Sequence, residues 1–330
     1  MNRRTSTYIY CAGAVILAGS ILGKFVGMPE LAELPADFTG TGVLTGSIQT
    51  HIDPNNVAQP KPVDVERTVS VIAVKGNRAI ITMKSKTYPH PRVDGAAPSL
   101  TDSHTYAIDR RTMRQVAPFG YTRVEDQQGG VTFALPPGEE GGDQTLYDTY
   151  TRSAQPLNYQ GPVTFHGRSG LRNVVDATGE IADEGLRGKL QALVSFRFQG
   201  DGNTVPKAAL VALGVPAEKL DSLPEALRVD YRVHNRTELI SDKRFGVIMN
   251  IDTVQSTSIS IEDAAELGLG EIPLTVTKVS SSDAAVTTTL ERLNDSERKL
   301  LLADIALGIA AALGAGLILF GIAGSRREPK

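Results

Sequence analysis

Ser169 lies in the segment that comes nearest to a known catalytic motif. Residues 167–171 read Gly-Arg-Ser-Gly-Leu, close to the G-x-S-x-G turn that presents a nucleophilic serine between a strand and a helix. That motif ends in glycine, whereas this chain has Leu171 there, and no alternation of strands and helices surrounds it. The segment therefore predicts an ordinary turn rather than a nucleophile.

The histidines and the acidic glycine-rich loop do not form a pattern that would hold a metal or a phosphate. Loop 138–143 is acidic, so it would repel phosphate; a weak calcium site is the alternative to a solvated loop. The histidines lack the H-x-H or H-x-x-x-H spacing that brings two imidazoles to one zinc ion. They are His51, His90, His104, His166 and His234. We expect no metal and no cofactor.

Aromatic side chains concentrate in one part of the chain. Seven of them fall between residues 119 and 165, and the chain has no tryptophan. Core packing is one interpretation, and the lining of a groove for an apolar ligand is the other. These seven aromatic residues, together with Leu135 and four leucines of 207–227, are the residues predicted to line a lipid groove. These are Phe119, Tyr121, Phe133, Leu135, Tyr147, Tyr150, Tyr159, Phe165, Leu210, Leu213, Leu220 and Leu227.

Strands dominate the elements that must position these residues. Apolar and polar residues alternate in 193–199, 228–234 and from Val247 towards Ile261, which predicts strands with one packed face. Gly76-Asn77 between two apolar runs predicts a hairpin. We therefore expect an α+β domain, mostly antiparallel β.

Two turns and a few short helices interrupt the predicted strands. Asp109 and Asp242 each begin a short turn between apolar segments, because an aspartate side chain can accept hydrogen bonds from the backbone that follows it. Residues 207–213 and 216–220 predict two short helices, and the capping pair Ser222 and Glu225 predicts a third. We expect these helices to cover a face or an edge of the sheet.

Both ends of the chain carry apolar runs. Tyr8–Gly23 reaches about 20 residues if Lys24 extends to the interface and the run continues to Met28. A cleaved signal peptide is the alternative, but no A-x-A-like site follows. Ile305–Gly324 is uncharged and about 30 Å long as a helix. Both runs therefore predict membrane-spanning helices.

The basic residues outside these runs set the predicted orientation. Arg3 and Arg4 precede the first run, and Arg326, Arg327 and Lys330 follow the second. Positive charge favours the cytoplasmic side, so both termini are predicted to be cytoplasmic at the plasma membrane, with the main domain in a periplasm-like space. The predicted layout is a tail and first span at 1–28, the β-rich domain at 29–284, a juxtamembrane helix at 285–304, a second span at 305–324 and a tail at 325–330.

The two predicted spans carry small residues at helical spacing. Such faces let two helices approach closely, either each other or another membrane protein, although glycine and alanine are also simply common in membrane helices. The predicted packing face consists of Gly19, Gly23, Gly27, Gly308, Ala312 and Gly316. Lys24 and Asp304 lie at the outer ends of their spans, where they form an ion pair or extend separately to water.

Charge and cysteine content exclude several classes of protein. The 34 basic and 37 acidic residues nearly balance, without the concentrated basic face of a nucleic-acid-binding protein. Cys11, the only cysteine, lies within the first apolar run, so the exported domain is predicted to lack disulfides and cysteine chemistry.

Several short motifs occur along the chain together with a final apolar helix. The motifs are Leu31–Asp37, Thr39–Gly42, Ala107–Thr112, Phe133–Gly138, Leu146–Asp148 and Pro156–Pro162. Together with this layout they resemble a family of actinobacterial envelope proteins that is labelled porin PorA-like or of unknown function and includes the lipoglycan-related mycobacterial protein LmcA. Tyr147 stands where the family usually has tryptophan, and Phe245 departs from its second turn motif.

The resemblance implies a two-anchor envelope protein that handles lipids or lipoglycans. It carries no catalytic residues across, and two apolar helices cannot alone form an aqueous pore. We expect a non-enzymatic protein that binds or carries a membrane lipid or lipoglycan intermediate. The alternative is a scaffold or regulator of an envelope-biosynthesis membrane enzyme, contacted through the spans; an envelope hydrolase ranks third.

Overall fold

The computed structural model divides the chain into two units that are considered separately. One is Pro35–Thr287; the other joins Met1–Leu34 to Thr288–Lys330. The structure describes residues 12, 14–21, 24, 33–53, 56–93, 95–136, 144–212, 215–221, 223–261 and 270–325.

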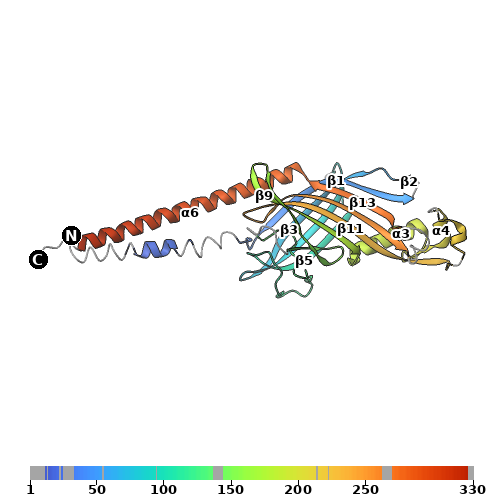
Figure 1. Ribbon diagram of the computed structural model, residues 1–330, viewed down its shortest axis with the longest axis horizontal. Helices are drawn as coiled ribbons and strands as arrows, with labels where there is room; N and C mark the ends of the chain where they lie inside the picture. Colours follow the sequence, from blue (N-terminus) through green and yellow to red (C-terminus); the bar gives the residue numbers. More distant parts are fainter. Residues whose placement is uncertain are drawn as a thin grey trace. The chain divides into compact units, whose positions relative to one another are not determined.

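One large antiparallel sheet forms the unit Pro35–Thr287, and its long strands lie side by side in Figure 1. Its strand order is β5-β4-β3-β1-β13-β12-β11-β9-β8, with β2 paired to β1 and β10 paired to β11. The strands are β1 (Thr39–Asp53), β2 (Asn56–Val57), β3 (Lys61–Lys75), β4 (Arg78–Pro89), β5 (Leu100–Asp109), β8 (Asn158–Phe165), β9 (Arg168–Glu180), β10 (Thr204–Pro206), β11 (Ala226–Asp242), β12 (Ile248–Ile261) and β13 (Ile272–Ser281). A separate hairpin joins β6 (Thr145–Asp148) to β7 (Ser153–Pro156).

Local sequence explains most of these strands. Gly76 adopts a positive φ of 61° in the turn between β3 and β4, so the predicted hairpin is confirmed. The strands predicted at 228–234 and from Val247 to Ile261 are confirmed inside β11 and β12, apart from Val247 itself. An antiparallel α+β domain is therefore confirmed as the fold of this unit.

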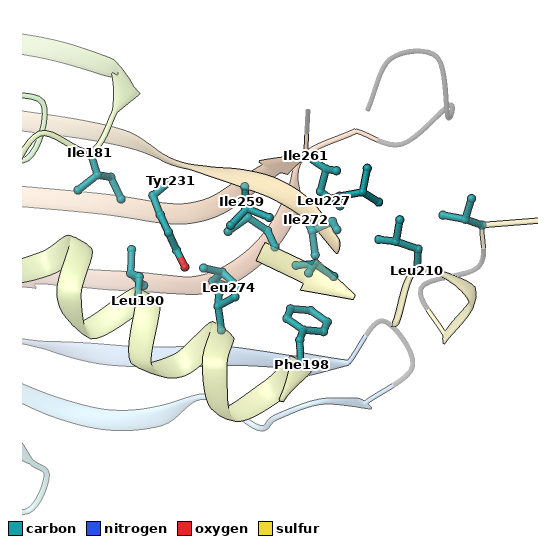
Figure 2. Close-up of a cluster of buried hydrophobic side chains, with 14 of the residues drawn as sticks. Ile181, Leu190, Phe198, Leu210, Leu227, Tyr231, Ile259, Ile261, Ile272 and Leu274 are labelled. Carbon is teal, nitrogen blue, oxygen red and sulfur yellow. The ribbon is translucent and has the colours of Figure 1, made fainter. Parts of the chain in front are cut away.

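The face of the sheet that carries Leu44, Arg67, His104 and Tyr231 is called the inner face here. Helix α3 (Glu184–Phe198) packs on it over β11, β12 and β13, and Figure 2 shows Leu190 and Phe198 near Tyr231 and Leu274. This core consists of Ile181, Leu190, Val194, Phe198, Val205, Leu210, Val215, Leu220, Leu227, Val229, Tyr231, Val233, Ile259, Ile261, Ile272 and Leu274.

The strand predicted at 193–199 is wrong, because these residues end helix α3. The Asp183 side chain caps the helix by accepting a hydrogen bond from the Leu186 backbone at 2.7 Å. Leu190, Val194 and Phe198, spaced four apart, form its buried stripe. Phe196, which a strand would have placed beside Val194 and Phe198, is 86% exposed. The sequence pattern resembled a strand only because Phe196, an apolar residue, lies on the exposed side of the helix.

The short helices that follow are partly as predicted. Helix α4 (Lys207–Ala212) and one 3-10 turn, η2 (Ala217–Lys219), confirm two of the three pieces. The third is wrong: residues 223–225 are not helical, and β11 begins at Ala226. The Glu225 carbonyl instead accepts a hydrogen bond from the Lys207 backbone at 2.8 Å, which joins α4 to the start of β11.

The two aspartate-led turns have the same geometry. Asp109 Oδ1 accepts from the backbone N–H groups of Arg111 and Thr112, each at 2.9 Å. Asp242 Oδ1 does the same for Arg244 at 2.9 Å and Phe245 at 2.8 Å. The side-chain capping that the sequence predicted is therefore confirmed in both turns.

The other unit contains most of helix α6 (Asp283–Ser325). Within the part of the chain that the structure describes, α6 alone is long and apolar enough to cross a membrane, over Asp283–Phe320. The predicted juxtamembrane helix and span are parts of this one helix. Of the first apolar run, residues 14–21 are helical. Lys24 Nζ lies 3.0 Å from Asp304 Oδ1, so the predicted ion pair is present.

Candidate ligand-binding site

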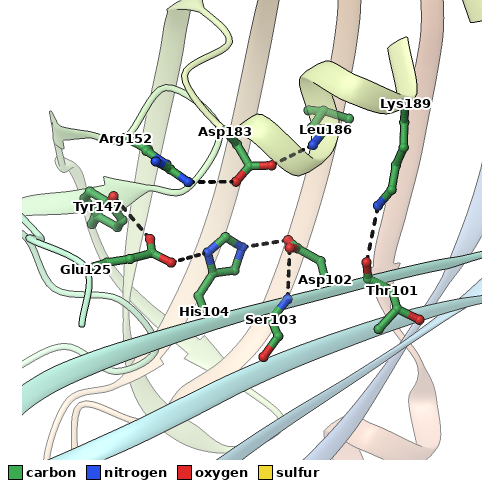
Figure 3. Close-up of polar contacts among 10 residues, drawn as sticks. All are labelled: Thr101, Asp102, Ser103, His104, Glu125, Tyr147, Arg152, Asp183, Leu186 and Lys189. Carbon is green, nitrogen blue, oxygen red and sulfur yellow. Dashed lines mark hydrogen bonds and ion pairs between the residues drawn. The ribbon is translucent and has the colours of Figure 1, made fainter. Parts of the chain in front are cut away.

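His104 lies on the inner face of β5 and is held on both sides by carboxylates. Alternation along the strand places Asp102, His104 and Tyr106 on one face. The His104 Nε2 atom is 2.6 Å from Asp102 Oδ2, and Nδ1 is 2.7 Å from Glu125 Oε1 (Figure 3). His104 is buried, so this clamp fastens loop 110–135 to the sheet.

The clamp keeps the His104 ring charged. Burial favours the neutral imidazole, but the hydrogen bonds to Asp102 and Glu125 outweigh it and raise the pKa of His104 to about 10. Burial acts against the Asp102 carboxylate too, yet the hydrogen bond with His104 leaves the Asp102 pKa below its usual value. Since both ring nitrogens donate protons, this imidazolium has no lone pair with which to act as a base.

Two tyrosines extend the clamp around His104 and Glu125. The Tyr106 ring stacks on His104 with centroids 6.2 Å apart and meets the Tyr147 ring edge-on at 6.0 Å. The Tyr147 hydroxyl donates to Glu125 Oε2 at 3.4 Å. Burial is the main cause that raises the pKa of both phenols, so both stay protonated. Tyr147 is one of the predicted groove residues, but here it packs against Tyr106 and bonds Glu125.

A second polar group links the β6–β7 hairpin to β11. Asp148 Oδ2 accepts from the Thr151 backbone at 2.8 Å, and Asp148 Oδ1 accepts from Asn235 Nδ2 at 2.9 Å. Nearby, Arg152 pairs with Asp183, the N-cap of α3, at 3.4 Å (Figure 3). These contacts hold the segment before α3 against the sheet.

Several buried polar atoms on and around the inner face have no hydrogen-bond partner among the described residues. Buried polar groups are normally paired, so each such atom marks a position where water or a ligand group is expected. They include Arg67 Nε, the Tyr106 hydroxyl, Asn235 Oδ1 and both amide atoms of Gln127.

An apolar strip borders Arg67 on the inner face. We call it the β1–β3 strip: Leu44, Val63 and Val279 are its buried members, and Ile48, Val65 and Ile251 are partly buried. Arg67 follows Val65 on the same face of β3 and pairs across the ladder with Gly42 of β1. A Cβ atom at Gly42 would meet no other atom within 4 Å, so open space lies beside the arginine.

The described groove candidates are distributed over different parts of the domain. Leu210, Leu220 and Leu227 are part of the α3 core, with Tyr150 packed against it, and Leu135 belongs to a separate cluster with Val131, Leu157, Val175 and Leu239. Tyr121 is exposed, while Phe119, Phe133, Tyr159 and Phe165 are partly buried; Leu213 lies outside the described residues.

The sequence missed the residues that the structure brings together. Arg67, Gly42 and Tyr106 were not among the predicted site residues. Alternation within β3 and β5 marks their faces, but only the strand order brings these faces onto one side of a shared sheet.

The opposite face of β3 and β4 is polar. A shallow hollow of about 360 Å³ lies there, lined by Glu66, Thr68, Ser70, Ile72, Thr82, Lys84 and Lys86. It offers no apolar wall beyond Ile72.

The predicted small-residue face of α6 is exposed. Gly308, Ala312 and Gly316 contact nothing that buries them, and a Cβ atom at Gly19, Gly308 or Gly316 would meet no atom within 4 Å. Gly23 and Gly27 lie outside the described residues. The described part of this face is therefore not packed within the chain.

An antiparallel-sheet domain that continues into an apolar helix long enough to span a bilayer is the class that the structure defines. Within that class, the chain belongs to the porin PorA family, whose profile matches residues 5–323. The resemblance to porin PorA-like proteins is thereby confirmed, and a membrane-associated protein fits both findings. Among curated proteins, no match is found.

Solved structures resemble the chain only faintly. A MaoC-like dehydratase is 9% identical, with 82% of each chain covered and a TM-score of 0.16. A putative thioesterase II from Thermobifida fusca YX is 10% identical over 73% of this chain and 77% of that one, with a TM-score of 0.13. An acyl-CoA thioesterase II from Mycobacterium marinum is 13% identical over 72% and 80%, with a TM-score of 0.12. Such scores carry no inference about activity.

Proposed function

We propose that this protein is a membrane-anchored, non-enzymatic envelope protein whose extracytoplasmic domain binds or carries a lipid or lipoglycan intermediate. The observation that carries the proposal is the β1–β3 strip, an incompletely covered apolar surface beside open space at Gly42. A ligand with an acyl chain would cover Ile48, Val65 and Ile251, and each methylene that it buries contributes about 0.8 kcal/mol.

The position of the strip in the chain supports the same proposal. Gly42 and Leu44 lie near the start of β1, and Ser281, paired with Leu44, ends β13 immediately before α6. The Ser282 backbone donates to the Val43 carbonyl at 2.9 Å, which fixes the start of α6 to β1. The strip therefore lies at the end of the sheet from which the chain continues into its apolar helix.

The proposed topology has two spans and two cytoplasmic termini. The Lys24–Asp304 ion pair supports pairing of the first apolar run with α6, since it joins the ends of the two segments. With both runs crossing the membrane, the domain between them lies outside the cytoplasm.

Filling the space at Gly42 tests lipid binding. The full chain is purified in maltoside detergent, and co-purifying lipid is extracted and measured by mass spectrometry. Gly42→Phe should abolish co-purification, because a phenyl ring then occupies the site. Gly188→Phe, at an exposed α3 position that also has open space around it, is the matched control and should keep the lipid. Absence of lipid from the wild type, or equal amounts in wild type and G42F, contradicts the proposal.

A scaffold or regulator of a membrane enzyme is the second candidate. The exposed face of Gly308, Ala312 and Gly316 favours it, because a partner helix could approach closely there. Exchange of both apolar segments for unrelated membrane helices distinguishes the two. Retained cellular function argues against the scaffold, and loss of function with unchanged lipid content argues for it.

A further inference from the structure

Arg67 is a partly buried cation on the inner face of β3, with no hydrogen-bond or ion-pair partner among the described residues. Its Nε atom is buried. The residue as a whole is partly exposed, but a buried N–H donor is normally paired, and leaving it unpaired costs free energy. An unpaired donor of a cationic side chain, with open space beside it, indicates the position of an anionic partner.

The carboxylates nearby are occupied by other groups. Asp102, two strands away in the same row of the ladder, is hydrogen-bonded to His104, and Glu125 holds the other side of that ring. Asp148 is held by Thr151 and Asn235. None of these carboxylates directly neutralises Arg67.

Two phenols lie within electrostatic reach of Arg67. Tyr106 is fully buried, and its hydroxyl has no hydrogen-bond partner among the described residues. Burial raises the pKa of Tyr106, and it raises that of Tyr150 to about 12, whereas Arg67 acts in the opposite direction on both. A protonated phenol is a hydrogen-bond donor, so Tyr106 offers a neutral donor on the same face of the sheet as Arg67.

We infer that Arg67 receives the anionic group of an acidic amphiphile, a phosphate or carboxylate oxygen, whose acyl chain lies along the β1–β3 strip. The assignment rests on the proposed function and adds the ligand's charge and orientation to it. The guanidinium binds two anionic oxygens with its planar array of donors, and Tyr106 donates a further hydrogen bond. Val65 and Leu44 follow directly on the same face, so head group and chain are bound side by side.

A pair of ligands that differ only in the phosphate tests the assignment. Native mass spectrometry on the full chain in maltoside measures binding of lysophosphatidic acid and of the monoacylglycerol with the same chain. Wild type should prefer lysophosphatidic acid at least tenfold. Arg67→Met should remove the preference and leave monoacylglycerol binding unchanged. Arg172→Met, the same change at an exposed arginine, is the matched control and should keep it.

Each other outcome of this experiment is decisive. Monoacylglycerol binding without preference in wild type leaves the lipid proposal standing and overturns the role of Arg67. Binding of neither amphiphile overturns both. Inorganic phosphate that binds as tightly as lysophosphatidic acid, and depends on Arg67, identifies a free-anion site and overturns the amphiphile.

Tyr106→Phe keeps the assignment testable where R67M fails to fold. Removing an unpartnered buried hydroxyl should leave the thermal unfolding temperature of lipid-free protein unchanged or higher, while it weakens lysophosphatidic acid binding several-fold. A lowered unfolding temperature with unchanged lysophosphatidic acid binding shows that the hydroxyl is structural and overturns its part in the site.

Discussion

Two regions of one sheet face differ in how completely they are covered. Over β11, β12 and β13, helix α3 closes the inner face; Leu274 and Val194 are fully buried, and the Tyr231 hydroxyl donates to the Gly202 carbonyl. Over β1 and β3, Ile48, Val65 and Ile251 are only partly buried, and Arg67 Nε has no hydrogen-bond partner among the described residues. The same sheet thus forms a closed core under α3 and an incompletely covered apolar surface over β1 and β3. We therefore expect stability to depend mainly on the first region and ligand binding on the second.

The largest expected effect comes from truncating one residue in each region. Leu274→Ala removes a fully buried side chain and should lower the free energy of unfolding by about 3 kcal/mol. Val65→Ala, in the partly buried strip, should cost about 1 kcal/mol or less. Denaturant titration of both variants, freed of lipid, measures the difference. Equal losses would show that the strip is as tightly packed as the α3 core.

An intermediate effect is expected at the histidine clamp. His104→Gln breaks the contacts of a buried cation with two carboxylates and should cost roughly 2 kcal/mol at neutral pH. This is less than for a fully buried pair, because Asp102 and Glu125 are 33% and 23% exposed. A loss below about 0.5 kcal/mol in thermal or denaturant unfolding would show that the clamp is not important for stability.

The pH dependence of the same variant sharpens this test. The folded pKa of His104, about 10, exceeds its ordinary value of 6.5, so its stabilisation is complete below pH 6.5 and declines as the pH rises towards 10. The lowered pKa of Asp102 works at the other end, since its contribution is lost as acid protonates the folded carboxylate. Unfolding free energies of the wild type should therefore fall between pH 6.5 and 10 relative to those of H104Q; parallel curves would contradict the charged clamp.

The smallest effect is expected at Phe196. Because its side chain is 86% exposed, Phe196→Ser should change the free energy of unfolding by less than about 0.5 kcal/mol. Val194→Ser, two residues earlier and fully buried, is the contrasting change and should be strongly destabilising. Equal effects of the two substitutions would contradict the assignment of the buried face of α3.

The sequence predicted the strands better than the site, and the reasons are physical. Period-2 alternation and the residue preferences of turns depend only on neighbouring residues. The hairpin at Gly76 and the turns at Asp109 and Asp242 could therefore be predicted from the sequence. Residues 193–199 were wrongly predicted to form a strand, because Val194, Phe196 and Phe198 alternate with polar residues. They end a helix whose N-cap, Asp183, lies ten residues before Leu193. Arg67 and Gly42 face each other only through the β1–β3 ladder, which no local pattern encodes.

A high-resolution experimental structure of the full chain, purified with its lipid, tests the central claim most directly. The account predicts continuous density of an acyl chain over Leu44, Val65 and Val279, beside Gly42, ending in an anionic group within hydrogen-bond distance of Arg67. Ordered water alone in that space, or protein side chains that fill it and pair with Arg67, would contradict it.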